Sequence, residues 1–265
     1  MQITKIMGER QHRAWVGPPD YYDRLGALQF VKLLMLGMRE NDTLLDIGCG
    51  SLRGGRFSLL YLNAGNYFGI EPEEWCLTEG ITAEIGNDLI KLKKPTFSSN
   101  NNFDARHFDR EFDYVMAAGI FMHACLDQAK MCFLSISQVL APNGIFVGAY
   151  LTGDTDSQES TWTYPHIQQY KSATIASLAE NCGLRLSFLE APHPLDHQWF
   201  VATPSTSSRD IVSRLDMEVF SWREYLANQL RMRGGVPQSY EYYLKSELKD
   251  RIAVDDAAVV PQARL

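Results

Sequence analysis

The sequence predicts an α/β fold in which a doubly wound, mostly parallel sheet of seven strands ends in an antiparallel strand. Three observations lead to this prediction. Short apolar runs alternate with segments of helical periodicity, the order expected for a parallel sheet covered by helices on both faces. A glycine-rich turn follows the first apolar run, within residues 44–55. The last two apolar runs are joined by a connection too short for a crossover helix, so we expect them to pair antiparallel.

The first regular element follows a polar and aromatic arm over residues 1–24. Glycine and proline interrupt the end of this segment, which we interpret as an arm or a lid. Apolar residues then recur at helical spacing and predict an amphipathic helix over residues 23–39, beside the first strand. They are Leu25, Leu28, Val31, Leu34, Met35 and Met38.

Strands and helices alternate from residue 43 onward. We expect strands at 43–47, 67–70, 112–117 and 145–150, and one more within 97–103. The intervals read as helices at 54–62, 73–85 and 127–140. A turn, Pro142-Asn143-Gly144, precedes the fifth strand.

The last part of the chain supplies the final strands of the sheet and then two helices that do not belong to the alternation of strands and helices. A helix is predicted at 172–181, before Gly183, followed by antiparallel strands at 184–189 and 198–202. Two charged helices, 211–232 and 240–251, then form a C-terminal helical appendage. The expected organisation is an arm at 1–24, a sheet domain at 25–203 and the appendage at 204–265.

Composition narrows the class of protein. The 265 residues are 45% hydrophobic and 22% charged, as in an ordinary globular domain, and no apolar run approaches the roughly 18 residues of a membrane span. The N-terminal residues lack the pattern of a secretory signal, and the five cysteines show no metal-binding spacing. We therefore expect a cytoplasmic protein without a bound metal. The net charge of -7 argues against a nucleic-acid partner.

The glycine-rich turn carries the clearest functional signal. The chain reads Leu44-Leu45-Asp46-Ile47-Gly48-Cys49-Gly50, and the next strand ends at Glu71, where an acid can bind ribose hydroxyls. Asp46 lies just before the first glycine. A carboxylate there would repel a dinucleotide diphosphate and attract a cationic amino-acid group, which favours S-adenosylmethionine over a nicotinamide cofactor.

These residues resemble the first two motifs of the class I S-adenosylmethionine-dependent methyltransferases, whose fold is Rossmann-like. Phe112-Asp113-Tyr114-Val115 and Leu140-Ala141-Pro142-Asn143-Gly144 resemble the family's fourth strand and the turn before its fifth. The resemblance covers about residues 25–203. It implies that S-adenosylmethionine is bound by Asp46, Gly48, Cys49, Gly50, Glu71, Ala118 and Gly119. Asp104-Ala105 resembles the family's third motif, which receives the adenine amino group, although a plain loop explains it equally well.

The sequence defines the binding site of the methyl acceptor less clearly than that of the cofactor. His123 follows the fourth strand, where an imidazole can act as a general base during methyl transfer; the alternative is a packing role at the start of the next helix. Aromatic residues from the arm and a late loop can form the walls of a substrate site. The candidate substrate residues are Tyr21, Tyr22, Trp162, Tyr164 and His166. His193 and His197 also lie in a loop that can border the pocket.

The sequence therefore predicts an enzyme that transfers a methyl group from S-adenosylmethionine to an oxygen or nitrogen of a small organic acceptor, in secondary or sugar metabolism. Two alternatives stay open. An NAD(P)-dependent oxidoreductase shares the glycine loop and the ribose acid. A non-catalytic scaffold would use the appendage as a partner surface. Apolar residues of the appendage, such as Phe220 and Leu226, are also compatible with a homodimer.

Overall fold

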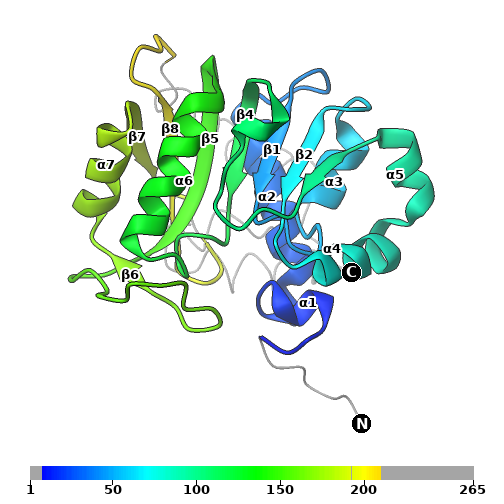
Figure 1. The fold of residues 1–265 in the computed structure, drawn as a ribbon, viewed down its shortest axis with the longest axis horizontal. Coiled ribbons are helices and arrows are strands. Elements are labelled where there is room, and N and C mark those ends of the chain that lie inside the picture. The colour runs from blue at the N-terminus through cyan, green and yellow to red at the C-terminus, as the bar shows by residue number, and fades with distance from the viewer. Residues whose placement is uncertain (1–7, 192, 210–265) are drawn as a thin grey trace, which may run out of the picture. The chain divides into compact units, whose positions relative to one another are not determined.

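A computed structural model describes residues 8–191 and 193–209. Its sheet follows the order β3-β2-β1-β4-β5-β8-β7, with the short β6 paired to β5 (Figure 1). Among the described strands of the main sheet, β8 alone runs antiparallel to its neighbours, β5 and β7. The predicted mostly parallel sheet with an antiparallel last strand is thus confirmed. The strands are β1 Leu44–Ile47, β2 Tyr67–Ile70, β3 Thr96–Ser98, β4 Phe112–Ala117, β5 Leu140–Thr152, β6 Gln169–Tyr170, β7 Leu184–Leu189 and β8 Gln198–Pro204.

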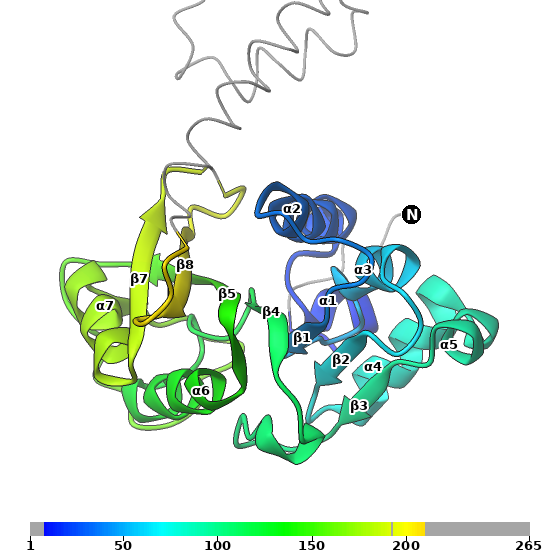
Figure 2. The ribbon, with the colours of Figure 1, turned by 90° about the horizontal axis from the view of Figure 1, so that it is seen from above.

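Helices cover both faces of this sheet. Figure 2 shows α2 and α3 on one face and α6 and α7 on the other. The α-helices are α1 His12–Trp15, α2 Tyr22–Met35, α3 Gly55–Tyr61, α4 Glu74–Gly80, α5 Asn87–Lys93, α6 Leu126–Val139 and α7 Ser172–Asn181. Short 3-10 turns lie at Pro19–Tyr21 and Arg106–Phe108. Two-sided coverage explains why the central strands are apolar on both faces.

The region after β2 departs from the single helix predicted at 73–85. Helix α4 ends at Gly80 and continues as a π-helical turn, Ile81–Ile85, before the separate helix α5. Gly80 packs directly against the glycine-rich loop, because a Cβ there would lie 2.3 Å from the Ser51 carbonyl oxygen. Gly86, at φ +79°, then redirects the chain into α5. These tertiary contacts give no periodic signal in the sequence.

Strand β5 is longer than predicted because it begins before the expected turn at 142–144. Its register with β4 jumps from the pair Phe112 and Leu140 to the pair Tyr114 and Ile145. The turn residues are therefore accommodated as an irregularity within one strand. Strand β6 has only two residues and was not predicted.

An aromatic cluster fixes the centre of the sheet. Phe121, Phe133, Phe146 and Phe200 are fully buried, and the rings of Phe121 and Phe133 stack at 5.1 Å. Phe146 and Phe200 meet edge to face at 5.3 Å across β5 and β8. A Cβ on Gly148 would lie 2.2 Å from the Phe200 ring, so this position needs glycine. The cluster holds β4, β5, β8 and α6 together beneath the loops at the carboxyl ends of the strands.

The predicted appendage helices at 211–232 and 240–251 lie outside the described residues, and the division into three segments stays a prediction. No helix within residues 8–191 and 193–209 is long and apolar enough to cross a membrane.

Candidate functional site

A cavity of about 660 Å³ opens at the carboxyl ends of β1, β2 and β4. The loop that leads into β8 reaches the same edge, because β8 runs antiparallel and starts where its neighbours end. A segment that we call the N-terminal segment, residues 8–21, also contributes to the lining. Ligands of doubly wound sheets bind at this edge, so the topology itself locates the site.

The glycine-rich loop, Gly48 to Gly50, forms a concave backbone surface, called the glycine cradle below, that has no room for side chains at its two glycines. Gly48 and Gly50 have φ angles of +68° and +56°, which favour glycine. A Cβ on Gly48 would lie 2.3 Å from Cδ1 of Ile120, and one on Gly50 would lie 2.5 Å from Val16. Gly48, Cys49 and Gly50 all line the cavity. The backbone of this loop is thereby exposed to a ligand at close range.

Asp46 lines the cavity at the end of β1. Its Oδ2 accepts a hydrogen bond of 2.7 Å from the Tyr67 hydroxyl, which leaves carboxylate lone pairs for a ligand. Burial raises the pKa of Asp46 to about 6, despite the lowering effects of the Tyr67 hydrogen bond and of Arg53. Cationic or donor groups of a ligand would stabilise its ionised form.

Glu71 lies beside Asp46 at the end of β2 and joins two backbone segments. Its Oε2 accepts the Gly50 N–H at 2.9 Å, and its Oε1 accepts the Glu73 N–H at 2.8 Å. Burial raises the pKa of Glu71 to about 7, although these two hydrogen bonds oppose the shift. The carboxyl group thus holds the glycine cradle against β2 and still faces the cavity.

Asp104 and Ala105, the expected adenine contacts, are not brought into the cavity. The Asp104 carboxylate accepts a 2.8 Å hydrogen bond from Nε of Arg106, and this interaction lowers its pKa to about 2. Ala105 is buried, with its N–H donated to Ser135 Oγ. Asn100, Asn101 and Phe103 line this part of the cavity instead. The alternative of a plain loop at Asp104-Ala105 agrees with this arrangement.

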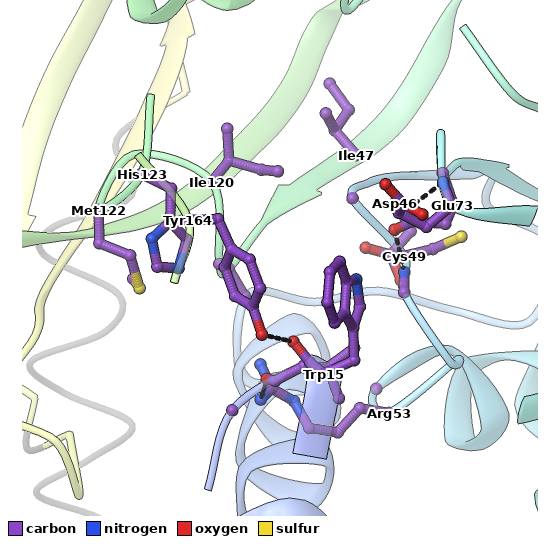
Figure 3. A pocket seen from close by; sticks show the side chains of 18 of the residues that line it. Trp15, Asp46, Ile47, Cys49, Arg53, Glu73, Ile120, Met122, His123 and Tyr164 are labelled. Carbon is purple, nitrogen blue, oxygen red and sulfur yellow. Dashed lines mark hydrogen bonds between the residues drawn. The ribbon is translucent and has the colours of Figure 1, made fainter. Parts of the chain in front are cut away.

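His123 lies across the cavity from Asp46 and Cys49, with Trp15 and Tyr164 between them (Figure 3). Its Nδ1 lies 2.9 Å from the carbonyl oxygen of His166, so Nδ1 carries the proton and Nε2 is the free acceptor. Burial lowers the pKa of His123, which keeps the imidazole neutral near pH 7. Ala118 and Gly119 line the cavity between the two sides.

The five predicted substrate residues separate into two groups. Trp162 and Tyr164 line the cavity, and the Tyr164 hydroxyl donates to the Trp15 carbonyl (Figure 3). Tyr22 is fully buried beneath the glycine loop, where its hydroxyl donates to the Ser51 carbonyl at 3.0 Å. Tyr21 is covered by Arg24, and His166 contributes its carbonyl rather than its exposed side chain. These last three residues are not among those that line the cavity.

Sequence reasoning missed Arg53 and Gln29, which also line the cavity. The signal for Arg53 was its place in the glycine-rich run, directly before Gly54. Gln29 lies on the buried face of α2, where a polar residue at an apolar helical position is itself informative. His193 and His197 do border the cavity, through the loop before β8.

No family model matches the chain. Solved structures show the same fold at low sequence identity. A magnesium protoporphyrin IX methyltransferase from Synechocystis PCC 6803, solved with bound SAH, is 12% identical, with a TM-score of 0.52 over 69% of this chain and 83% of that one. The DhpI–SAH complex is 17% identical, with a TM-score of 0.52 over 75% and 94%.

The glycopeptide N-methyltransferase MtfA, complexed with S-adenosyl-L-homocysteine, is 11% identical, with a TM-score of 0.53 over 68% of this chain and 90% of that one. These likenesses, the strand order and the antiparallel β8 lead to one conclusion. The chain has the fold of the class I S-adenosylmethionine-dependent methyltransferases.

Proposed function

We propose that the protein is a methyltransferase that uses S-adenosylmethionine and modifies an oxygen or nitrogen atom of a small organic acceptor. One observation carries the proposal: Asp46 and Glu71 flank a glycine cradle in the same cavity that His123 faces from the opposite side. Solved structures that share the fold include two methyltransferases with bound S-adenosylhomocysteine.

The residues of the cradle fit S-adenosylmethionine. Asp46 and Glu71 are acids whose pKa values are raised by burial, so each gains from a positive charge or a hydrogen-bond donor. The cofactor offers an ammonium group and ribose hydroxyls, which are such donors. We assign Asp46 to the amino-acid part and Glu71 to the ribose. Asn100, Asn101 and Phe103 would bind the adenine, in place of Asp104.

Methyl transfer needs alignment and the removal of a proton. When bound, S-adenosylmethionine supplies an electrophilic methyl group on its sulfonium. Cavity walls formed by Trp15, Tyr164 and Ile120 restrict how an acceptor can approach, and alignment gives most of the acceleration in such displacements. His123 Nε2 then takes the proton from the attacking hydroxyl or amine, because its Nδ1 is held by the His166 carbonyl.

The size of the site supports a small acceptor. A volume of about 660 Å³ lies within the range of ~300–1,000 Å³ typical of small-molecule pockets, and the proposed cofactor would occupy part of it. The net charge of -7 also disfavours nucleic acid as the acceptor.

The first test is calorimetric titration of the full chain with S-adenosylhomocysteine, beside NADH and NADPH. We expect binding of S-adenosylhomocysteine alone, with a dissociation constant in the micromolar range. Binding of a nicotinamide cofactor instead would replace the proposal with redox chemistry. Binding of none of the three would favour a non-catalytic scaffold.

A further inference from the structure

Three side chains of the cavity lining carry N–H groups that the proposed transfer does not use. Arg53 approaches the cavity from the loop before α3, and His193 and His197 approach it from the loop before β8. Asp46 and Glu71 account for the cofactor side, and the proposed transfer uses His123. The arginine and the histidine pair have no role in that scheme, so their chemistry needs its own explanation.

Arg53 is a cation whose hydrogen bonds are incomplete. Its Nη1 donates to the Val16 carbonyl of the N-terminal segment. Its Nε is buried and has no hydrogen-bond partner within the described residues. Burial lowers the pKa of Arg53 to about 10, so the guanidinium keeps its charge at neutral pH. A buried N–H of a charged group without an acceptor is costly, and an acceptor oxygen would offset that cost.

The histidine pair presents further donors beside this cation. The two rings stack with their centroids 4.3 Å apart. His193 Nδ1 accepts the Leu195 N–H at 3.1 Å, so the proton of the neutral ring lies on Nε2. His197 Nδ1 is buried and has no hydrogen-bond partner within the described part of the chain. Burial, together with Arg53 and the neighbouring charges, lowers the pKa values of His193 and His197 to about 3 and 4.

Lys32 adds a second positive charge behind this group. It is 7% exposed on α2, and its Nζ lies 4.8 Å from the centre of the Trp199 ring. That ring lies 5.3 Å from His193. Two cations close to a pair of neutral histidines create a positive potential, which disfavours a metal ion. Arg53 interacts with Asp46, but Asp46 is already hydrogen-bonded to Tyr67.

We propose that the methyl acceptor carries an anionic oxygen group, a carboxylate or a phosphate, that binds to Arg53 and the His193 and His197 pair. This inference rests on the proposed function, because it names the class of molecule that is methylated. A guanidinium N–H and imidazole N–H groups are donors that bind such anions. A neutral hydroxyl would accept from one N–H but would form no charge-assisted hydrogen bond with Arg53. The cavity lining then divides its roles by charge, with the acids binding the cofactor and the cationic group binding the acceptor.

The test uses histidine side-chain NMR of the full chain, recorded with and without S-adenosylhomocysteine. Three probes share one aromatic ring: benzoate, phenyl phosphate and the neutral benzyl alcohol, each titrated at constant ionic strength. We expect saturable shifts of the His193 and His197 signals with at least one anion. The affinity should exceed that for benzyl alcohol by about tenfold or more, the scale of one charge-assisted hydrogen bond. The stronger of the two anions identifies the source as a carboxylate or a phosphate.

Variants assign the site to named residues. Arg53→Gln and His197→Phe should each weaken anion binding by about tenfold. Arg39→Gln, which removes an exposed charge outside the cavity, should leave it unchanged. Because Arg53 also holds Val16, His197→Phe serves as the second variant if Arg53→Gln does not fold. Equal affinity for the anions and the alcohol, or no saturable shift, would overturn the inference.

The titrations with S-adenosylhomocysteine distinguish failure of this inference from failure of the proposed function. If the parent protein does not bind S-adenosylhomocysteine, the methyltransferase proposal is contradicted. The anion titrations of the ligand-free protein would still test the anion site. Retained cofactor binding without an anion preference would overturn only the acceptor class.

Discussion

At the scale of single residues, the proposed roles of Asp46 and Glu71 predict that cofactor affinity depends on pH. The pKa values of Asp46 and Glu71 are raised to about 6 and 7, so both carboxyl groups are partly protonated below neutrality. A cationic ligand binds the ionised forms, and its affinity therefore falls as the pH falls through 7 and 6. We expect the dissociation constant of S-adenosylmethionine to rise by about tenfold between pH 8 and pH 6.

Calorimetry in buffers of different ionisation enthalpy checks this dependence. Binding near pH 6.5 should release protons, because the ligand favours ionised carboxylates. Proton uptake, or affinity independent of pH between 6 and 8, would show that the acids do not face the cationic groups.

Substitution of Glu71 tests the cofactor site most directly. Glu71→Gln keeps the shape of the side chain but removes its charge and one acceptor, while Gly50 and Glu73 both donate to it. S-adenosylhomocysteine affinity should fall by about tenfold or more. Glu111→Gln, an exposed control, should bind like the parent protein. Unchanged affinity in Glu71→Gln would remove Glu71 from the cofactor site.

Substitution of His123 distinguishes an effect on turnover from an effect on cofactor binding. His123→Gln should lower turnover by about 10²- to 10⁴-fold, the usual contribution of a general base, with cofactor affinity unchanged. The matched control is His166→Gln, because His166 positions His123 through its backbone carbonyl and its side chain is exposed. Single-turnover methylation of an identified acceptor provides the measurement. Near-parental turnover of His123→Gln would leave His123 with a packing role.

At the scale of elements, the strands were predictable and several connections were not. Apolar runs and turn residues located β1, β2, β4 and the β7 and β8 hairpin to within about two residues, because burial on both faces leaves a direct mark on the sequence. The end of α4 at Gly80 lies in contact with the Ser51 backbone. Such a contact joins residues that lie far apart along the chain, and no local pattern encodes it.

Some residues of the candidate site were likewise predictable from the sequence, and others were not. Asp46, the glycines and Glu71 were found because backbone geometry and charge constrain them locally. Arg53 was missed because its role depends on the N-terminal segment, whose Val16 carbonyl it binds. Tyr22 was assigned to the substrate because of its type, whereas the fold uses it to support Ser51. Residue type alone does not distinguish an aromatic wall from an aromatic support.

Glu84 ties the N-terminal segment to the domain and offers an element-scale prediction. Its carboxylate, 5% exposed, accepts from His12 and Arg13 at 2.7 Å and from Arg56 at 2.8 Å. Glu84→Gln removes the buried charge that Arg13 and Arg56 share and leaves them only the exposed Asp23 as a common partner, so it should cost about 1–3 kcal/mol of stability. The segment carries Trp15 and Val16 into the cavity, so S-adenosylhomocysteine affinity should fall as well.

Limited proteolysis distinguishes this outcome from general unfolding. The Glu84→Gln protein should be cleaved faster within residues 8–21, while the sheet domain stays resistant. Asp88→Asn removes an exposed acid that pairs with Lys91 and should change neither cleavage nor affinity. Equal cleavage rates in the parent and Glu84→Gln would show that Glu84 does not hold the segment.

At the scale of the whole molecule, the buried acids and the buried histidines of the cavity affect stability with opposite dependence on pH. Asp46 and Glu71 bind protons at higher pH in the folded state than in the unfolded chain, so their contribution to stability grows as the pH falls from 7 towards 4. His193 and His197 have pKa values lowered to about 3 and 4, against an unfolded value near 6.5. Their contribution is present above pH 6.5 and is lost as the pH falls.

Removing the two histidines tests this opposite pH dependence. In the ligand-free protein, the stability gained from the acids and the stability lost from the histidines offset each other between pH 7 and pH 5. The double variant His193→Phe, His197→Phe keeps only the acid trend. Its free energy of unfolding, relative to that of the parent, should therefore rise by about 1–2 kcal/mol from pH 7 to pH 5, after allowance for partial exposure of both rings. Urea unfolding at the two pH values gives this difference directly. All other titrating groups are common to both proteins. A pH-independent difference would therefore mean that the histidine rings are freely solvated, and the proposed anion site would then lose its electrostatic basis.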